Sequence, residues 1–169
     1  EDSKVMSALE ELIRISKEAD IPAEIYHLKS SRKPNWKKID DIIKRVEEVR
    51  GQGLKITADI YTYNASSTGL TGVIPTWVQE GGHKAWIERM KDPNIRPRLL
   101  EDIRKELSEQ PPEGILMVGF KTSEMSKKYL SKTVAEAANM RGQSPEEAIV
   151  DMVIEDDNRI QCIYFSMSE

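Results

Sequence analysis

The alternation of helix and strand patterns over the first 61 residues constrains the fold of this chain most. Apolar residues recur every three or four positions over 5–15, which predicts an amphipathic helix that ends before Pro22, because proline cannot extend it. The short apolar run 23–28 predicts a buried strand. A second amphipathic helix over 36–49 and a second strand over 54–61 repeat the unit. This rhythm is typical of a parallel α/β sheet with covering helices, and the right-handed crossover rule makes the two strands neighbours or near neighbours.

The pattern changes after residue 61. Residues 62–76 are rich in Ser, Thr, Gly and Asn, and this composition predicts a loop. A largely helical stretch follows, with one helix expected after Gly82. A second helix is expected to begin at Asp92-Pro93, which offer an N-cap and a first-turn proline, and to end at Gln110.

The last third of the chain combines two further strands with two capped helices. Strands are expected over 114–120 and 160–165, where short apolar runs occur. Thr133 and Ser144 are each followed three residues later by a glutamate, and this capping-box pattern predicts the start of a helix at each position.

Composition excludes several classes of protein. Hydrophobic residues make up 38% of the 169 residues, which is enough for a core and excludes general disorder, while no apolar run is long enough for a transmembrane helix. The single Cys162 excludes a disulfide framework and is expected to be a small buried hydrophobe. The net charge of −4 gives no general reason to expect nucleic acid or an anionic membrane as a partner. We expect a cytoplasmic protein that binds neither.

The end of the first strand carries the residues that most suggest chemistry. His27 and Lys29 lie where the strand passes into its following loop, and Asp59 and Tyr61 lie at the corresponding point of the second strand. Function in parallel α/β folds collects at such strand ends. A neutral imidazole there suits zinc. The alternative is a partly buried histidine whose ring is hydrogen-bonded to a backbone carbonyl.

The loop after this strand is basic and contains an aromatic residue. Such a patch fits phosphate or single-stranded nucleic acid. The alternative is a solvated loop, because four carboxylates lie close in sequence. The basic residues are Lys29, Arg32, Lys33, Lys37 and Lys38, and the aromatic residue is Trp36.

Four short motifs follow one another along the first half of the chain: EIYHLK at 24–29, NW at 35–36, ADIYTY at 58–63 and SSTGL at 66–70. Together they resemble the family of metal-dependent D-aminoacylases, the N-acyl-D-amino-acid deacylases of the amidohydrolase superfamily. The family pattern runs I-S-H-x-K, N-W or N-F, D-x-Y-P-Y and A-G-S-T. Later stretches are also similar, namely 81–93, 116–120, 135–145 and 163–169.

The resemblance implies a fold. It implies an α/β protein that is a partial (β/α)8 amidohydrolase barrel, with about strands six and seven, a late strand and a mainly helical insertion. Residues 1–66 would be barrel βα units, 67–159 the insertion or lid, and 160–169 a return strand to the barrel. Glu1 would be the last residue of an H-x-R-x-E motif, so we expect the chain to be an internal piece of a longer protein.

The resemblance also implies roles for individual residues. His27 matches a zinc ligand, and Lys29 and Tyr61 match the groups that hold the free carboxylate of the substrate. The catalytic aspartate matches a position outside this chain, so no catalytic base is expected within it. Ser67, Tyr164 and Met167 match positions that line the pocket for the D-amino-acid side chain. Two residues depart from the family pattern: Tyr26 stands for the usual serine and Thr62 for the usual proline.

The function implied is that of a fragment of a zinc-dependent hydrolase that removes the acyl group from N-acyl-D-amino acids. The fragment carries one of the usual three protein ligands of the zinc ion, so we expect it to be inactive alone and its zinc site to be incomplete. Its partners would be the rest of its own barrel and, through exposed strand edges, a second copy in a homodimer. The alternative is a non-enzymatic α/β binding module whose helical insertion docks a partner.

Overall fold

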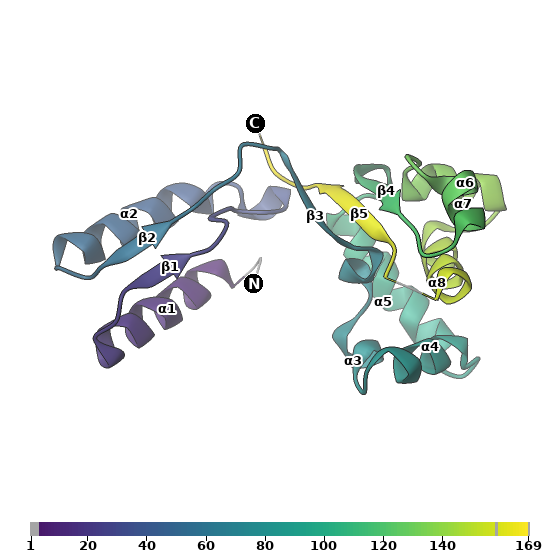
Figure 1. Ribbon diagram of the computed structural model, residues 1–169, viewed down its shortest axis with the longest axis horizontal. Coiled ribbons are helices and arrows are strands. Elements are labelled where there is room, and N and C mark those ends of the chain that lie inside the picture. The colour runs from purple at the N-terminus through teal and green to yellow at the C-terminus, as the bar shows by residue number, and fades with distance from the viewer. Residues whose placement is uncertain (1–3, 158, 169) are drawn as a thin grey trace. The chain divides into compact units, whose positions relative to one another are not determined.

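The computed structural model describes residues 4–157 and 159–168. The chain divides into two compact units (Figure 1). The first contains the chain up to Asn64 together with the segment from Ser166, and the second contains residues 65–165. Glu1, expected to be the last residue of an H-x-R-x-E motif, lies outside the described residues.

The first unit has the helix and strand order that the sequence predicts. β1 and β2 are parallel neighbours, with Ala23 opposite Ile56, as expected from the crossover rule. Both strands are shorter than the apolar runs, and β1 ends just before the chain turns sharply at His27, whose φ is +56°. The elements are α1 (Val5–Ala19), β1 (Ala23–Ile25), a 3-10 turn (Lys33–Asn35), α2 (Lys38–Gly51) and β2 (Ile56–Ala58).

The two helices of the first unit bury their apolar stripes with the sheet. Each stripe follows the three-and-four spacing seen in the sequence, so burial rather than intrinsic propensity holds these helices in place. The buried core of this unit consists of Leu9, Ile13, Ile42, Val46, Val49 and Ile56.

The second unit contains a three-stranded antiparallel sheet in the order β3-β5-β4. Its strands are β3 (Ala65–Gly69), β4 (Ile115–Gly119) and β5 (Gln161–Phe165). The prediction of a loop over 62–76 is wrong: 65–69 form a strand and Leu70–Val73 a 3-10 turn. The Ser-Thr-Gly composition carries no apolar alternation, and the strand is stabilised by backbone pairing with β5. Residues 161–165, expected in a return strand, are the central strand of this sheet.

The described residues of the second unit form six helices beside the sheet, and the starts of these helices test the capping predictions. Thr133 and Ser144 each form a capping box, as predicted. The predicted start at Asp92 is wrong, because the Asp92 carboxylate accepts a hydrogen bond from the Asn94 backbone in a turn, and the helix begins at Arg96. The helices are α3 (Thr76–Gln79), α4 (His83–Lys91), α5 (Arg96–Glu109), α6 (Ser123–Tyr129), α7 (Val134–Arg141) and α8 (Pro145–Asp156), with a further 3-10 turn at Pro112–Gly114.

The core of the second unit lies between its helices and the sheet. Cys162 is fully buried there, as predicted for a small hydrophobe, and burial raises the pKa of its thiol to about 12. Among the described residues, none of the helices is both long enough and apolar enough to cross a membrane.

Candidate functional site

The ends of β1 and β2 are joined by hydrogen bonds that form a tight turn around His27. The Leu28 backbone N–H donates to the Asp59 carbonyl oxygen at 2.8 Å, and the Asp59 N–H donates to the Ile25 carbonyl oxygen at 3.2 Å. The His27 N–H donates to the Asp59 carboxylate at 2.5 Å. The residues that follow the C-terminal ends of the two parallel strands are therefore held close together.

The imidazole of His27 lies between two aromatic rings. It stacks on Tyr26, with ring centroids 3.7 Å apart, and meets Tyr61 edge-on at 5.0 Å. Its ring nitrogens form no hydrogen bond with any residue that the structure describes. The alternative interpretation of the sequence, a histidine ring hydrogen-bonded to a backbone carbonyl, is therefore not seen among these residues. The half-exposed ring is available to a ligand.

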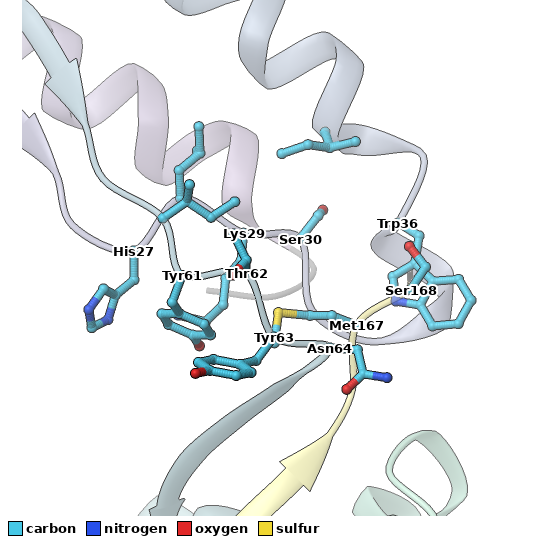
Figure 2. Close-up of a pocket in the computed structure, with 13 residues that line it drawn as sticks. His27, Lys29, Ser30, Trp36, Tyr61, Thr62, Tyr63, Asn64, Met167 and Ser168 are labelled. Atoms are coloured by element: carbon cyan, nitrogen blue, oxygen red, sulfur yellow. The ribbon is translucent and has the colours of Figure 1, made fainter.

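A cavity of about 580 Å³ lies in the first unit beside this turn. His27, Lys29, Tyr61 and Met167, four of the six residues singled out from the sequence, line it together (Figure 2). Figure 2 shows that they come from the segments that follow the two strands and from the segment near the C-terminus. Apolar side chains, namely Leu28, Trp36, Ile39 and Ile60, supply much of the rest of the wall.

Lys29 and Tyr61 form the polar part of the cavity. The Lys29 ammonium lies 5.4 Å from the centroid of the Tyr61 ring, a distance suited to a cation–π contact. Among the described residues, no carboxylate pairs with Lys29 and no group hydrogen-bonds the Tyr61 hydroxyl. An ammonium that no described carboxylate pairs with and a phenol hydroxyl that no described residue hydrogen-bonds are donors suited to a carboxylate of a ligand.

Trp36 anchors the segment that carries Met167. Its indole N–H donates to the Ser166 carbonyl oxygen at 3.0 Å, and the Arg32 backbone N–H donates to the same oxygen at 2.7 Å. The Met167 N–H donates to the Asn64 carbonyl oxygen at 3.2 Å. In the sequence, Trp36 lies at the start of a predicted amphipathic helix, in a basic patch and in the N-W motif, and none of these features predicted the anchoring role. The signal that could have found it is the indole N–H, which requires an acceptor when buried.

The basic loop is cross-linked internally. The Lys38 ammonium donates to the Asn35 side-chain oxygen at 2.7 Å, and the Asn35 amide donates to the Ser31 carbonyl oxygen at 2.9 Å. The Ser30 hydroxyl donates to the Asn35 carbonyl oxygen at 2.6 Å. These bonds fix the loop that forms one wall of the cavity.

The other two predicted pocket residues belong to the second unit and do not line this cavity. The Ser67 hydroxyl donates to the Cys162 carbonyl oxygen at 3.3 Å. The Tyr164 side chain packs in the core of the second unit, and its hydroxyl donates to the Gly69 carbonyl oxygen at 2.8 Å. Both hydroxyls are thus engaged within their own sheet.

The described residues contain no cluster of three or more His, Cys, Asp or Glu side chains that could hold a metal ion. Catalytic zinc sites use three protein ligands. His27, with ring nitrogens that no described residue engages, fits the role of a single ligand. The described residues therefore do not form a complete metal site by themselves.

No protein-family model and no curated protein matches this chain. Solved structures do match it. The N-acyl-D-glutamate deacylase of Bordetella bronchiseptica, complexed with zinc and a phosphonate inhibitor that mimics the tetrahedral reaction intermediate, aligns with a TM-score of 0.65 and 19% identity, over 98% of this chain and 26% of its own. Two D-aminoacylase structures, one of them in complex with copper chloride, align with TM-scores of 0.62 and 0.61 at 23% identity and the same coverage. This chain has the fold of a D-aminoacylase segment.

At the level of the fold, the match to these structures confirms the resemblance to D-aminoacylases that the sequence motifs indicated. The chain spans about a quarter of the length of the structures it matches. Its α/β architecture with small sheets fits a fragment of the amidohydrolase fold.

Proposed function

We propose that this chain is part of a metal-dependent amidohydrolase that removes the acyl group from N-acyl-D-amino acids, with β1 and β2 as two adjacent strands of its barrel. One observation carries the proposal. His27, Lys29, Tyr61 and Met167, whose roles the motifs imply independently, line one cavity at the ends of two adjacent parallel strands. Strand ends of this kind carry the active sites of barrel enzymes.

Lys29 and Tyr61 hold the free carboxylate of the substrate in this proposal. The ammonium provides a charge-assisted hydrogen bond and the phenol adds a neutral donor. The absence of a carboxylate partner for Lys29 in the described residues supports the assignment, because an ammonium in a largely apolar cavity gains from an anionic ligand.

His27 contributes one ligand to a divalent metal, proposed to be zinc. Such a metal, when bound, polarises the amide carbonyl and lowers the pKa of a coordinated water. The role of this chain is to orient: the turn at His27 presents the ring to the cavity, and Lys29 and Tyr61 fix the carboxylate. Met167, a flexible side chain, provides an adaptable apolar wall for the D-amino-acid side chain.

Kinetics of the complete gene product on N-acetyl-D-amino acids test the proposal, with the L-enantiomers as the stereochemical control. We expect Lys29→Met to raise KM roughly 10- to 100-fold, because a charge-assisted contact to the substrate is lost. The matched control is Lys37→Met, an exposed lysine of the neighbouring loop that does not line the cavity. Equal KM values for these two variants would contradict the carboxylate assignment.

Metal analysis tests the other half of the proposal. His27→Ala is expected to lower the bound metal per chain and to abolish turnover, because catalytic sites hold their metal with few protein ligands. Full metal content and turnover in His27→Ala would contradict the proposal. We further expect the 169-residue chain to show no turnover by itself, since its described residues contain no group of three or more His, Cys, Asp or Glu side chains that could hold a metal ion.

A further inference from the structure

We infer that Asp59 is a positioning residue for His27: its carboxylate holds the left-handed turn that aims the imidazole into the cavity. The inference rests on the proposed function and deepens it, because it assigns a role to a residue next to the site that touches neither substrate nor metal in that proposal.

Strand pairing between β1 and β2 stops short of His27. The last paired residues are Ile25 and Ala58, so the His27 amide lies beyond the strand ladder. The residue also adopts a φ of +56°, in the left-handed region that side-chain-bearing residues seldom occupy. The left-handed conformation needs a compensating contact, because a residue with a side chain adopts it at a cost in free energy.

Asp59 supplies that contact with three of its groups. Its carboxylate accepts from the His27 N–H at 2.5 Å, its carbonyl oxygen accepts from the Leu28 N–H at 2.8 Å, and its N–H donates to the Ile25 carbonyl oxygen at 3.2 Å. The two backbone bonds survive substitution of the side chain, whereas the bond to the amide of His27 depends on the carboxylate. The side chain of Asp59 therefore acts on the conformation of His27 specifically.

The backbone conformation at His27 in turn sets the direction of its ring. With φ fixed, the Cβ direction is fixed, and the imidazole lies stacked on Tyr26 and edge-on to Tyr61. Asp59 Oδ1 accepts the hydrogen bond from the His27 N–H, and we assign this carboxylate the role of holding the turn. Rotation of the turn would move the ring out of both aromatic contacts and away from Lys29, which lies over Tyr61.

Histidine-selective ¹⁵N labelling of the 169-residue chain tests the inference directly. The chain has two histidines, so its spectrum contains two histidine amide signals, and His83 in the second unit is an internal reference. Asp59→Ala is expected to accelerate hydrogen exchange at the His27 amide roughly 10- to 100-fold and to shift its ring signals, because the amide loses its hydrogen-bond acceptor. The His83 signals should stay unchanged.

Two further variants keep the test decisive if Asp59→Ala destabilises the first unit. Asp59→Asn retains an acceptor oxygen and is expected to restore the His27 amide and ring signals to near the parent values. Glu47→Ala, which removes an exposed carboxylate on α2, is expected to change neither. Unchanged His27 signals in Asp59→Ala, or equal losses in Asp59→Asn and Asp59→Ala, would overturn the inference.

Kinetics of the complete gene product separate this inference from the proposed function. At full metal occupancy, Asp59→Ala is expected to lower kcat roughly 10- to 100-fold with KM changed less than threefold, and Asp59→Asn to recover most of kcat, as for residues that orient a ligand. Loss of activity in His27→Ala together with parental kcat in Asp59→Ala would overturn the positioning role alone. Parental activity in His27→Ala would overturn the proposed function, and the His27 amide signals would still decide whether Asp59 holds the turn.

Discussion

His27 and Tyr61 meet edge to face, with ring centroids 5.0 Å apart and ring planes at 77°. The same Tyr61 ring lies 5.4 Å from the Lys29 ammonium. The Tyr61 ring therefore contacts both the residue proposed to bind the metal and the residue proposed to bind the carboxylate. Substitutions that remove only the hydroxyl, or the whole ring, distinguish the contributions of these two groups.

Tyr61→Phe keeps the ring and removes the hydroxyl. We expect KM for N-acetyl-D-amino acids to rise about 3- to 10-fold, because one neutral hydrogen bond to the substrate is lost, with kcat nearly unchanged. Tyr61→Ala also removes the contacts to His27 and Lys29 and should lower kcat as well. Steady-state kinetics of the complete gene product measure both, and a parental KM in Tyr61→Phe would show that the hydroxyl does not bind substrate.

Asp156 is a fully buried carboxylate in the second unit, and its substitution should be costly. It accepts hydrogen bonds from the Lys121 N–H at 2.8 Å, the Thr122 N–H at 2.9 Å and the Thr122 hydroxyl at 3.0 Å. Asp156→Ala leaves these donors without an acceptor and should lower the free energy of unfolding by about 3 kcal/mol. Urea denaturation measures the change. Asn139→Ala, at an exposed site on α7, is the control, and a loss equal to that of the control would contradict the prediction.

Asp157 should make the second unit sensitive to acid. The Lys121 ammonium, and after it His83, lower the pKa of this carboxyl to about 2. A carboxyl whose folded pKa lies below its unfolded value stabilises the fold above the unfolded pKa, near 4, and loses that contribution as the pH falls toward 2. The thermal midpoint of the parent should therefore fall more between pH 4 and pH 2 than that of Asp157→Asn. An equal fall of the thermal midpoint in the parent and in Asp157→Asn would show that the contacts of Asp157 with Lys121 and His83 do not stabilise the second unit.

Cys162 should be inert in the folded chain. It is fully buried in β5, and burial raises the pKa of its thiol to about 12. At pH 8 the thiolate fraction is then about a thousandfold lower than for an ordinary thiol, so alkylation by iodoacetamide should require unfolding. Mass spectrometry after labelling with and without urea measures this, with Asn139→Cys as an exposed reference. Rapid labelling of Cys162 without urea would contradict the burial.

Local sequence patterns predicted the helices best where amphipathic spacing coincided with a capping residue. The capping boxes at Thr133 and Ser144 were read correctly because each is formed by two residues three positions apart, within a single turn. Asp92 carried a similar signal, yet its side chain accepts from Asn94 in a turn instead. An aspartate side chain can cap a helix or accept a hydrogen bond within a turn, and the residues around Asp92 do not distinguish these two structures.

The sequence by itself determined the parallel arrangement of the first unit, through apolar spacing, and the identity of the residues to examine at its strand ends. Only the tertiary structure decided that Ala65–Gly69 is a strand, because a segment of Ser, Thr and Gly pairs through its backbone and leaves no periodic trace. It also decided that Asp59, 32 positions away, holds the turn at His27. Contacts between residues distant in sequence depend on how strands align in space, and local pattern carries no information about that alignment.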